Sequence, residues 1–294
     1  MDRLVTAKFW RIEKANDDVP SFSACLRAIA KRPLSEREDK IGNTYLMRLE
    51  RLEEEGSFLA GEFVRRQIEN IPPNAKTGVP MEPLKLGSDG SLAHRSAFRF
   101  HSKMSILVLQ SSQGGVRPPS VSSYITRFEE SQGYVAKPVL PSEVWQKLSA
   151  SAPRRFRLKV AEPHNLGLAE DTDGGMQRVL EDLNDTYGGV ELVIEVSAGR
   201  KRNAFLNKVP LLHLVRSLTR RGSAPLSGVK ALSVGVDTGE GIEELDFLTG
   251  QLVEKEQLRL PDDDVEGHYR ARQEFLRSVV QRHWQAIREQ MRDG

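Results

Sequence analysis

The chain begins with the alternation of hydrophobic and polar positions that is typical of a half-buried strand. Over residues 4–11, even and odd positions fall on opposite faces of an extended segment, and one face is the more apolar. Ser21 then precedes Phe22, Leu26 and Ile29, which recur at helical spacing. A serine in this position predicts an N-cap, and the spacing predicts a helix behind it.

The rest of the first half continues this mixture of elements. Strands are expected over 42–49, 57–64 and 97–109, although 57–64 also fits a short helix. Helices are expected after Pro119, where Val121, Ile125 and Phe128 share one face, and from Ser142, a second expected N-cap, to Ala150. The polar segment 70–92 holds four prolines and three glycines and predicts a loop.

In the second half the patterns alternate more regularly. Strands are expected over 154–161, 190–197 and 229–236, with helices over 176–184 and 206–221 between them. Such alternation indicates at least some parallel pairing. The segment 245–260 is typical of a hairpin that turns at Thr249 and Gly250.

The chain ends in a long amphipathic pattern. Asp262, Asp263 and Asp264 stand where the positive end of a helix favours negative charge. The apolar ridge of the expected helix consists of Val265, Tyr269, Leu276, Val280, Trp284, Ile287 and Met291. This ridge packs against the chain's own core, the other domain or a second subunit.

Together these elements predict an α+β fold with two domains and mixed sheets. We expect an N-terminal domain over 1–150 and a C-terminal domain over 151–294, the latter with strand-helix alternation and the long final helix. A chain of 294 residues is long enough for both. Cys25 is the only cysteine, which excludes an intramolecular disulfide and fits a reducing compartment. The start has no apolar leader and no run reaches the length of a membrane span, so we expect a cytoplasmic protein without direct membrane insertion.

Charge is sorted into blocks along the second half, although the net charge of the chain is only +2. Residues 196–231 carry eight cations and no carboxylate, whereas 162–195 and 237–264 each carry a balance of −8. A segregated basic block is the usual electrostatic mark of a polyanion partner. Including the neighbouring strand, the candidate phosphate contacts are Arg155, Arg157, Lys159, Arg200, Lys201, Arg202, Lys208, Arg216 and Arg220.

These cations form three groups with different alternatives. Arg155, Arg157 and Lys159 share one strand face, and they either bind phosphate or pair across the sheet with Glu191 and Glu195.

The second group, Arg200 to Arg202, follows Gly199 in an expected turn, which is either a binding site or a solvated loop near the acidic segments. On the following helix, Arg216 and Arg220 lie one turn apart, with His213 close to the same side. Arg221 is explained equally well as a cation at the negative end of the helix.

The most direct interpretation is a DNA-binding protein without catalytic activity, metal or cofactor. Many cations on one surface suit non-specific double-stranded DNA, and four to six phosphate contacts predict a log-log salt slope of about −4 to −5. No phosphate-binding loop, nucleophile elbow, zinc-protease helix or base-reading motif is present.

Two alternatives stay open. Asp185, Glu191 and Glu195 would be the carboxylates of a metal-dependent nuclease, although the usual Glu-x-Lys pair is absent. Otherwise the basic block docks an acidic partner or the chain's own acidic segments.

Several strings also resemble one family over most of the chain. They are Gly42-Asn43-Thr44-Tyr45-Leu46, the apolar strand 192–196 running into 199–203, the strand 230–236, and the late segment 246–260 with the helix behind it. This order is similar to that of RexA-like phage exclusion proteins, whose architecture is similar to that of the recombination-associated RdgC proteins.

The resemblance implies a homodimer that binds DNA without sequence specificity and acts in phage exclusion, superinfection immunity and the lysis-lysogeny decision, with a RexB-like membrane protein as partner. Only Arg200, Lys201 and Arg202 carry over. Where the family alternates charge in the next helix, this chain has the apolar Leu206, Val209, Pro210, Leu211 and Leu212.

Overall fold

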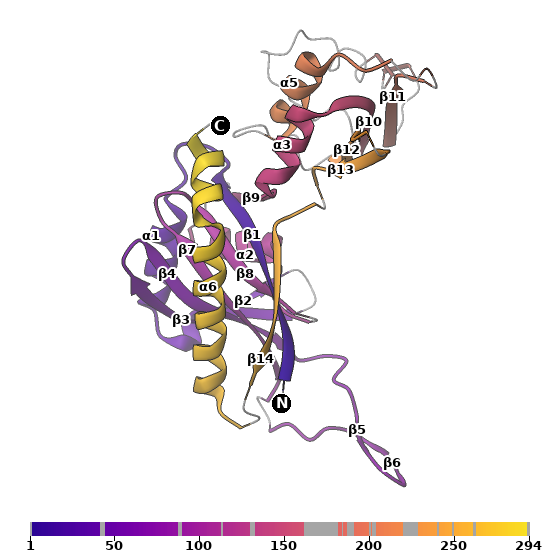
Figure 1. Ribbon diagram of the computed structural model, residues 1–294. Helices are drawn as coiled ribbons and strands as arrows, with labels where there is room; N and C mark the ends of the chain where they lie inside the picture. The colour runs from indigo at the N-terminus through magenta and orange to yellow at the C-terminus, as the bar shows by residue number, and fades with distance from the viewer. Residues whose placement is uncertain are drawn as a thin grey trace. The chain divides into compact units, whose positions relative to one another are not determined.

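The computed structural model describes residues 2–41, 45–87, 90–112, 114–129, 133–161, 182–183, 185–186, 191–199, 201, 204–219, 229–239, 241–248, 250–260 and 263–292 (Figure 1). Helices and several sheets are both present, which confirms the α+β fold class. The chain divides into two compact units. The first consists of Met1–Lys137 and Val253–Trp284, and the second of Pro138–Leu252 and Gln285–Gly294. A division into folding domains at residue 150 stays a prediction, and each unit is described by itself below.

The first unit is built on one large sheet in which the expected N-terminal strand has a neighbouring strand on each side. The strands follow the order β14-β1-β8-β7-β4-β3-β2, and β9 also pairs with β1. Their bounds are β1 Asp2–Lys14, β2 Glu38–Ile41, β3 Tyr45–Glu55, β4 Phe58–Gln67, β7 Leu92–His101, β8 Ile106–Ser111, β9 Tyr134–Pro138 and β14 Val253–Arg259. The alternation read from residues 4–11 is confirmed, because Val5, Ala7 and Phe9 are buried on one face of β1.

Two expectations for this unit need correction, and one open alternative is decided. The single strand expected over 97–109 is two antiparallel strands, β7 and β8. The turn between them was missed because it contains neither glycine nor proline. Ser105 supplies the turn instead, with a positive φ of 55°. The loop expected over 70–92 contains a small hairpin, β5 (Asn74–Lys76) with β6 (Val79–Glu82). Residues 58–67 form a strand, which decides between the two alternatives for 57–64.

Two helices cover one face of this sheet. They are α1 (Phe22–Ala30) and α2 (Pro118–Glu129), with the short 3-10 helix η1 (Leu34–Glu36) after α1. The predicted N-cap is confirmed, since the Oγ of Ser21 accepts a hydrogen bond of 3.3 Å from the backbone N–H of Ala24. Phe22, Leu26 and Ile29 of α1 pack with Val121 and Ile125 of α2 in one core.

A buried tyrosine ties α2 to the chain around it. The hydroxyl of Tyr124 accepts from the N–H of Leu49 and donates to the carbonyl of Arg37, so it serves two backbone groups at once. Burial raises the pKa of Tyr124 far above its ordinary value, so this hydroxyl stays protonated and available as a donor.

The long helix α6 (Val265–Arg292) runs along the opposite face of the sheet (Figure 1). Asp264 caps it, because its Oδ1 accepts a 2.7 Å hydrogen bond from the N–H of Gly267. Asp262 lies outside the described residues. Of the predicted apolar ridge, Tyr269, Leu276, Val280 and Ile287 are buried, whereas Val265 is exposed.

Charged side chains are buried together with this ridge. Glu62 on β4 is 1% exposed, and its carboxylate accepts hydrogen bonds of 2.9 and 2.8 Å from the guanidinium of Arg95 on β7. Arg272 on α6 places Nη1 3.6 Å from the same carboxylate. Close by, Gln273 donates to the backbone carbonyls of Gly61 and Phe98. The helix is therefore fixed to the sheet by a charged layer as well as by apolar contact.

The second unit is a four-stranded sheet in the order β11-β10-β12-β13. Its strands are β10 (Ala152–Ala161), β11 (Glu191–Ser197), β12 (Val229–Asp237) and β13 (Ile242–Asp246), and its helices are α3 (Ser142–Ala150) and α5 (Lys208–Thr219). The expected helix over 176–184 lies almost wholly outside the described residues. Ser142 is not the N-cap of α3, because the cap position is Pro141 and no side chain caps the helix. The core joins Leu148 of α3 and Val215 of α5 to the apolar face of the sheet.

Two expectations about pairing in the second half are wrong. The pairs β10-β11, β10-β12 and β12-β13 are all antiparallel. The crossover through α5 does join strands that run in the same direction, but β10 lies between them, so β11 and β12 do not pair. The hairpin expected over 245–260 is also absent, since β13 pairs with β12 whereas β14 pairs with β1 of the first unit.

Candidate nucleic-acid interface

The exposed face of β10 carries the three cations that its sequence predicted. Arg155 and Arg157 are exposed and Lys159 is half-buried, while Phe156, Leu158 and Val160 on the other face are buried. The segregation follows directly from the two-residue repeat of a strand.

Carboxylates of the neighbouring strands stand opposite these cations. The Nη2 of Arg155 lies 2.7 Å from Oε2 of Glu244 on β13, and the Nζ of Lys159 lies 2.9 Å from Oε1 of Glu191 on β11. Arg157 is directly opposite Glu195 in the β10-β11 register. The cross-sheet placement weighed for Glu191 and Glu195 is thus confirmed, and this face is close to neutral.

The titration of the Arg155–Glu244 pair agrees with its geometry. The hydrogen bond to Glu244 raises the pKa of Arg155, and the charge of that carboxylate acts in the same direction. Burial raises the pKa of Glu244, but hydrogen bonds from Arg155 and Ser233 outweigh it and hold this pKa below its ordinary value. Both partners therefore stay charged at neutral pH and satisfy each other.

The segment 198–207, here called the basic loop, is tied to the start of β10. Ala198 donates its N–H to the carbonyl of Arg154 at 2.8 Å, and Leu206 donates to the carbonyl of Pro153 at 2.7 Å. The guanidinium of Arg154 in turn donates to the carbonyl of Gly199, whose φ of +70° suits glycine. These bonds close both ends of the basic loop and present Lys201, which is exposed, from a defined base.

Helix α5 continues from the basic loop and turns a polar face outward. Leu211, Val215 and Leu218 of the predicted core stripe are buried, while His213 and Arg216 are exposed. Lys208 is the first residue of α5, and the first turn holds no acidic residue. A cation in this position is repelled by the positive end of the helix dipole and destabilises the helix. Helix stability therefore does not explain why a lysine stands at position 208. An anion at this end would be favoured by both charges.

The candidate cations therefore separate into three sets. Arg155, Arg157 and Lys159 face carboxylates, as given above. Lys201, Lys208 and Arg216 form no ion pair with any residue in the described part of the chain. The positions Arg200, Arg202 and Arg220, together with Arg221, lie outside the described residues.

Sequence reasoning missed two residues of this region, Phe205 and Arg154. Phe205 is 49% exposed, and the guanidinium carbon of Arg154 lies 5.6 Å from the centre of its ring. One sequence signal points to Phe205, because it is the only Phe, Tyr or Trp in the basic block 196–231. Nothing in the spacing of Arg154 shows that its side chain reaches over the basic loop.

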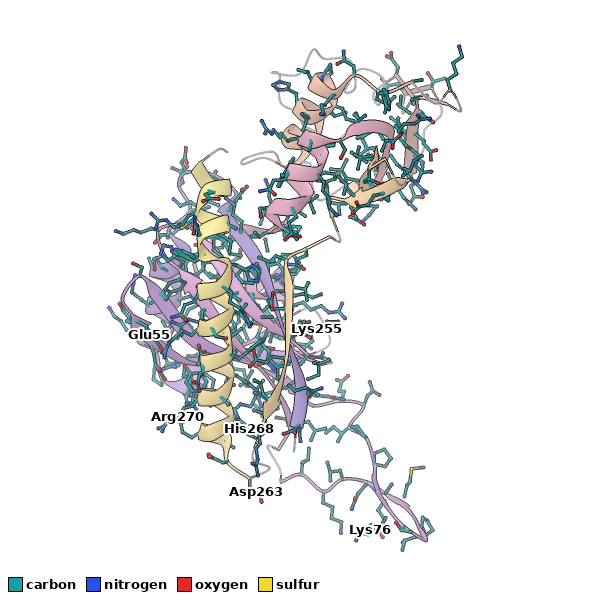
Figure 2. All side chains as sticks on the ribbon, viewed as in Figure 1. Glu55, Lys76, Lys255, Asp263, His268 and Arg270 are labelled. Atoms are coloured by element: carbon teal, nitrogen blue, oxygen red, sulfur yellow. The ribbon has the colours of Figure 1, made fainter. Side chains whose placement is uncertain are left out.

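A pocket of about 360 Å³ in the first unit is a second candidate site. Figure 2 labels two of its lining residues, Glu55 and Arg270, beside α6. Glu55 already pairs with Arg99 and Arg277, at 2.6 and 2.8 Å, and Arg270 with Glu266 at 3.1 Å. Because these charges satisfy one another, the pocket lacks the single-sign surface that a polyanion requires.

The described residues contain no group of three or more His, Cys, Asp or Glu side chains that would hold a metal ion. Of the carboxylates weighed for a nuclease, Glu191 pairs with Lys159 and Asp185 is exposed. None of the described helices combines the length and apolarity needed to cross a membrane.

Comparison with known protein families gives a match. Residues 21–285 match a family described as a family of unknown function, DUF6731, and this range covers most of both units. No curated protein matches the chain.

Proposed function

The chain belongs to this family of unknown function, DUF6731, and we propose that it binds DNA through the sugar-phosphate backbone, without sequence specificity. The observation that carries the proposal is the contrast between two sets of cations in one unit. On β10, Arg155 and Lys159 form ion pairs and Arg157 lies opposite Glu195 in the register, whereas Lys201, Lys208 and Arg216 have no ion-pair partner among the described residues. Cations left unpaired on one segment are available to neutralise phosphate groups.

The geometry of α5 supports the same partner. At the start of α5, the charge of Lys208 adds to the partial positive charge of the helix dipole. A phosphate group bound there would neutralise both charges. Arg216 lies two turns further on the exposed side. Because no described side chain in the region forms a base-reading motif, contacts to the backbone dominate and affinity is independent of sequence.

Fluorescence anisotropy with two unrelated duplexes of equal length tests the proposal. The loop triple replaces Lys201, Lys208 and Arg216, which form no ion pair with any described residue, by alanine. The matched sheet triple replaces Arg155, Arg157 and Lys159 by alanine, so both variants lose the same charge. We expect equal affinity of the wild-type chain for the two duplexes, a large loss in the loop triple and a small loss in the sheet triple. Equal losses in both triples would refute this site, and wild-type binding to neither duplex at low salt would refute the function.

The same preparation decides between DNA binding and its alternatives. Incubation of plasmid with Mg²⁺ or Mn²⁺, followed by electrophoresis, detects a nuclease, whose cleavage would be lost in Glu195→Ala. Absence of DNA binding even at low salt would favour an interaction protein whose basic loop docks an acidic partner. Our proposal requires binding without cleavage.

The biological setting follows from the resemblance alone and stays a prediction. It comprises a cytoplasmic homodimer, phage exclusion or superinfection immunity, and a RexB-like membrane protein as partner. Sedimentation of the purified chain tests the homodimer, and a neighbouring gene for a multi-pass membrane protein would support the partner.

A further inference from the structure

Phe205 is a large aromatic side chain that the second unit leaves half exposed. Its neighbour Leu206 packs against the core, and the N–H of Leu206 is held by the carbonyl of Pro153 at 2.7 Å. The backbone at this point is therefore anchored while Phe205 is 49% exposed. Burying a phenylalanine stabilises a fold, and the unit forgoes part of this gain.

The surroundings of the ring are cationic. The guanidinium of Arg154 lies over the ring at 5.6 Å from its centre, and the same group donates to the carbonyl of Gly199 in the basic loop. Lys201 is exposed on that loop, and Lys208 begins α5 three residues after the ring. The next residue of α5, Val209, is 61% exposed. An exposed aromatic ring and an exposed aliphatic side chain thus lie on the same short segment as Lys201 and Lys208, which form no ion pair with any described residue.

We infer that Phe205 stacks on an unpaired base, so that the ligand of this site is single-stranded nucleic acid in preference to duplex. Bases within a duplex already stack on one another, whereas an unpaired base offers a free π-face. A positive groove combined with an exposed aromatic ring is the usual arrangement of proteins that bind single strands without sequence preference. The inference rests on the proposed function, because the cations of the basic loop must hold the phosphates beside the ring.

Binding of labelled oligo(dT) and oligo(rU) of about 16 nucleotides, compared with a duplex of the same length, tests the inference. One stacked base contributes about 1–3 kcal/mol, so Phe205→Ala is expected to weaken single-strand binding by about 5-fold to about 150-fold. Duplex affinity should be nearly unchanged, and Phe205→Tyr should retain single-strand affinity. Equal behaviour of oligo(dT) and oligo(rU) is expected, because stacking does not require the 2′-hydroxyl.

Two further variants separate stacking from other roles of the ring. Phe205→Trp should show indole fluorescence quenching on addition of oligo(dT) that the wild-type chain does not show, which a merely structural ring would not produce. Phe205→Leu keeps an apolar side chain without a π-face and should behave as Phe205→Ala. Wild-type affinity in Phe205→Leu would overturn stacking in favour of an apolar protein contact, and an equal loss for duplex and single strand in Phe205→Ala would also overturn it. One further outcome would contradict only this inference. In it, the wild-type chain binds duplex, the loop triple abolishes that binding, and the wild-type chain binds oligo(dT) no better than duplex. Failure of the wild-type chain to bind either would remove the proposed function as well.

Discussion

Replacing Glu62 by glutamine tests whether the charged layer holds α6 on the first sheet. The glutamine keeps the size of the side chain but removes the charge that Arg95 and Arg272 share. Burial lowers the pKa of Arg272, and the nearby charge of Arg95 lowers it further, so without Glu62 two like charges would face each other in a buried place.

The size of the effect follows from the burial of the three groups. Removing one partner of a buried ion pair costs about 3–5 kcal/mol. The side chain of Glu62 is 1% exposed, whereas Arg95 is 14% exposed and also donates to the carbonyl of Val265. Because Arg95 keeps that partner and some contact with water, we expect the lower end of the range, about 3 kcal/mol.

Urea denaturation followed by tryptophan fluorescence measures the change. Trp10 and Trp284 belong to the first unit and Trp145 to the second, so a Trp145→Phe background restricts the signal to the first unit. Glu54→Gln is the matched control, since the pair of Glu54 with Arg27 is exposed, and it should leave the urea midpoint almost unchanged. If Glu62→Gln shifted the midpoint no more than Glu54→Gln, the charged layer would not hold α6.

Three further predictions concern the first unit. Gly61→Ala should destabilise it by about 1–3 kcal/mol in the same urea assay, because a Cβ at this position would lie 2.6 Å from both the ring of Phe98 and the carbonyl of Arg51; wild-type stability would contradict this packing. Tyr124→Phe should cost about 1–3 kcal/mol, since it leaves a buried N–H and a carbonyl without their hydroxyl partner, and hydrogen exchange at Leu49 should accelerate. The hydrogen bond from Arg99 lowers the pKa of Glu55, although burial acts against it. The ionised Glu55 therefore stabilises the folded state above the unfolded carboxyl pKa of about 4.3, and this stabilisation disappears as the pH falls through the lower folded pKa. Glu55→Gln should therefore reduce the loss of stability below about pH 4.3 in an acid titration, and an unchanged acid profile would contradict this assignment.

Local patterns predicted individual elements of this chain well. The alternation in β1 and β10, the N-cap at Ser21 and the stripe of α5 each depend on residues within a few positions, and each is confirmed. Pairing depends on contacts between distant segments, and here prediction failed. The segment 245–260 alternates as a hairpin would, yet its two strands belong to different sheets.

The candidate site shows the same limit. The register that places Arg157 opposite Glu195 follows from neighbouring strands and was foreseen as an alternative. Glu244 was not foreseen as the partner of Arg155, because the strand expected nearest to it began only at residue 245, whereas β13 begins at Ile242. The burial of Arg272 on the apolar side of α6 was equally hidden, since its carboxylate partner, Glu62, is more than two hundred positions earlier in the chain.

The salt dependence of DNA affinity in the two matched triples tests the central claim most directly. Each phosphate contact contributes about −0.9 to the slope of log affinity against log salt concentration on duplex DNA. The account predicts that the slope of the loop triple, Lys201, Lys208 and Arg216 to alanine, is shallower than that of the wild-type chain by about 2.7, which is three contacts. The slope of the sheet triple, Arg155, Arg157 and Lys159 to alanine, should stay close to the wild-type value. Equal slopes for the loop triple and the wild-type chain, or a larger change in the sheet triple, would contradict the account.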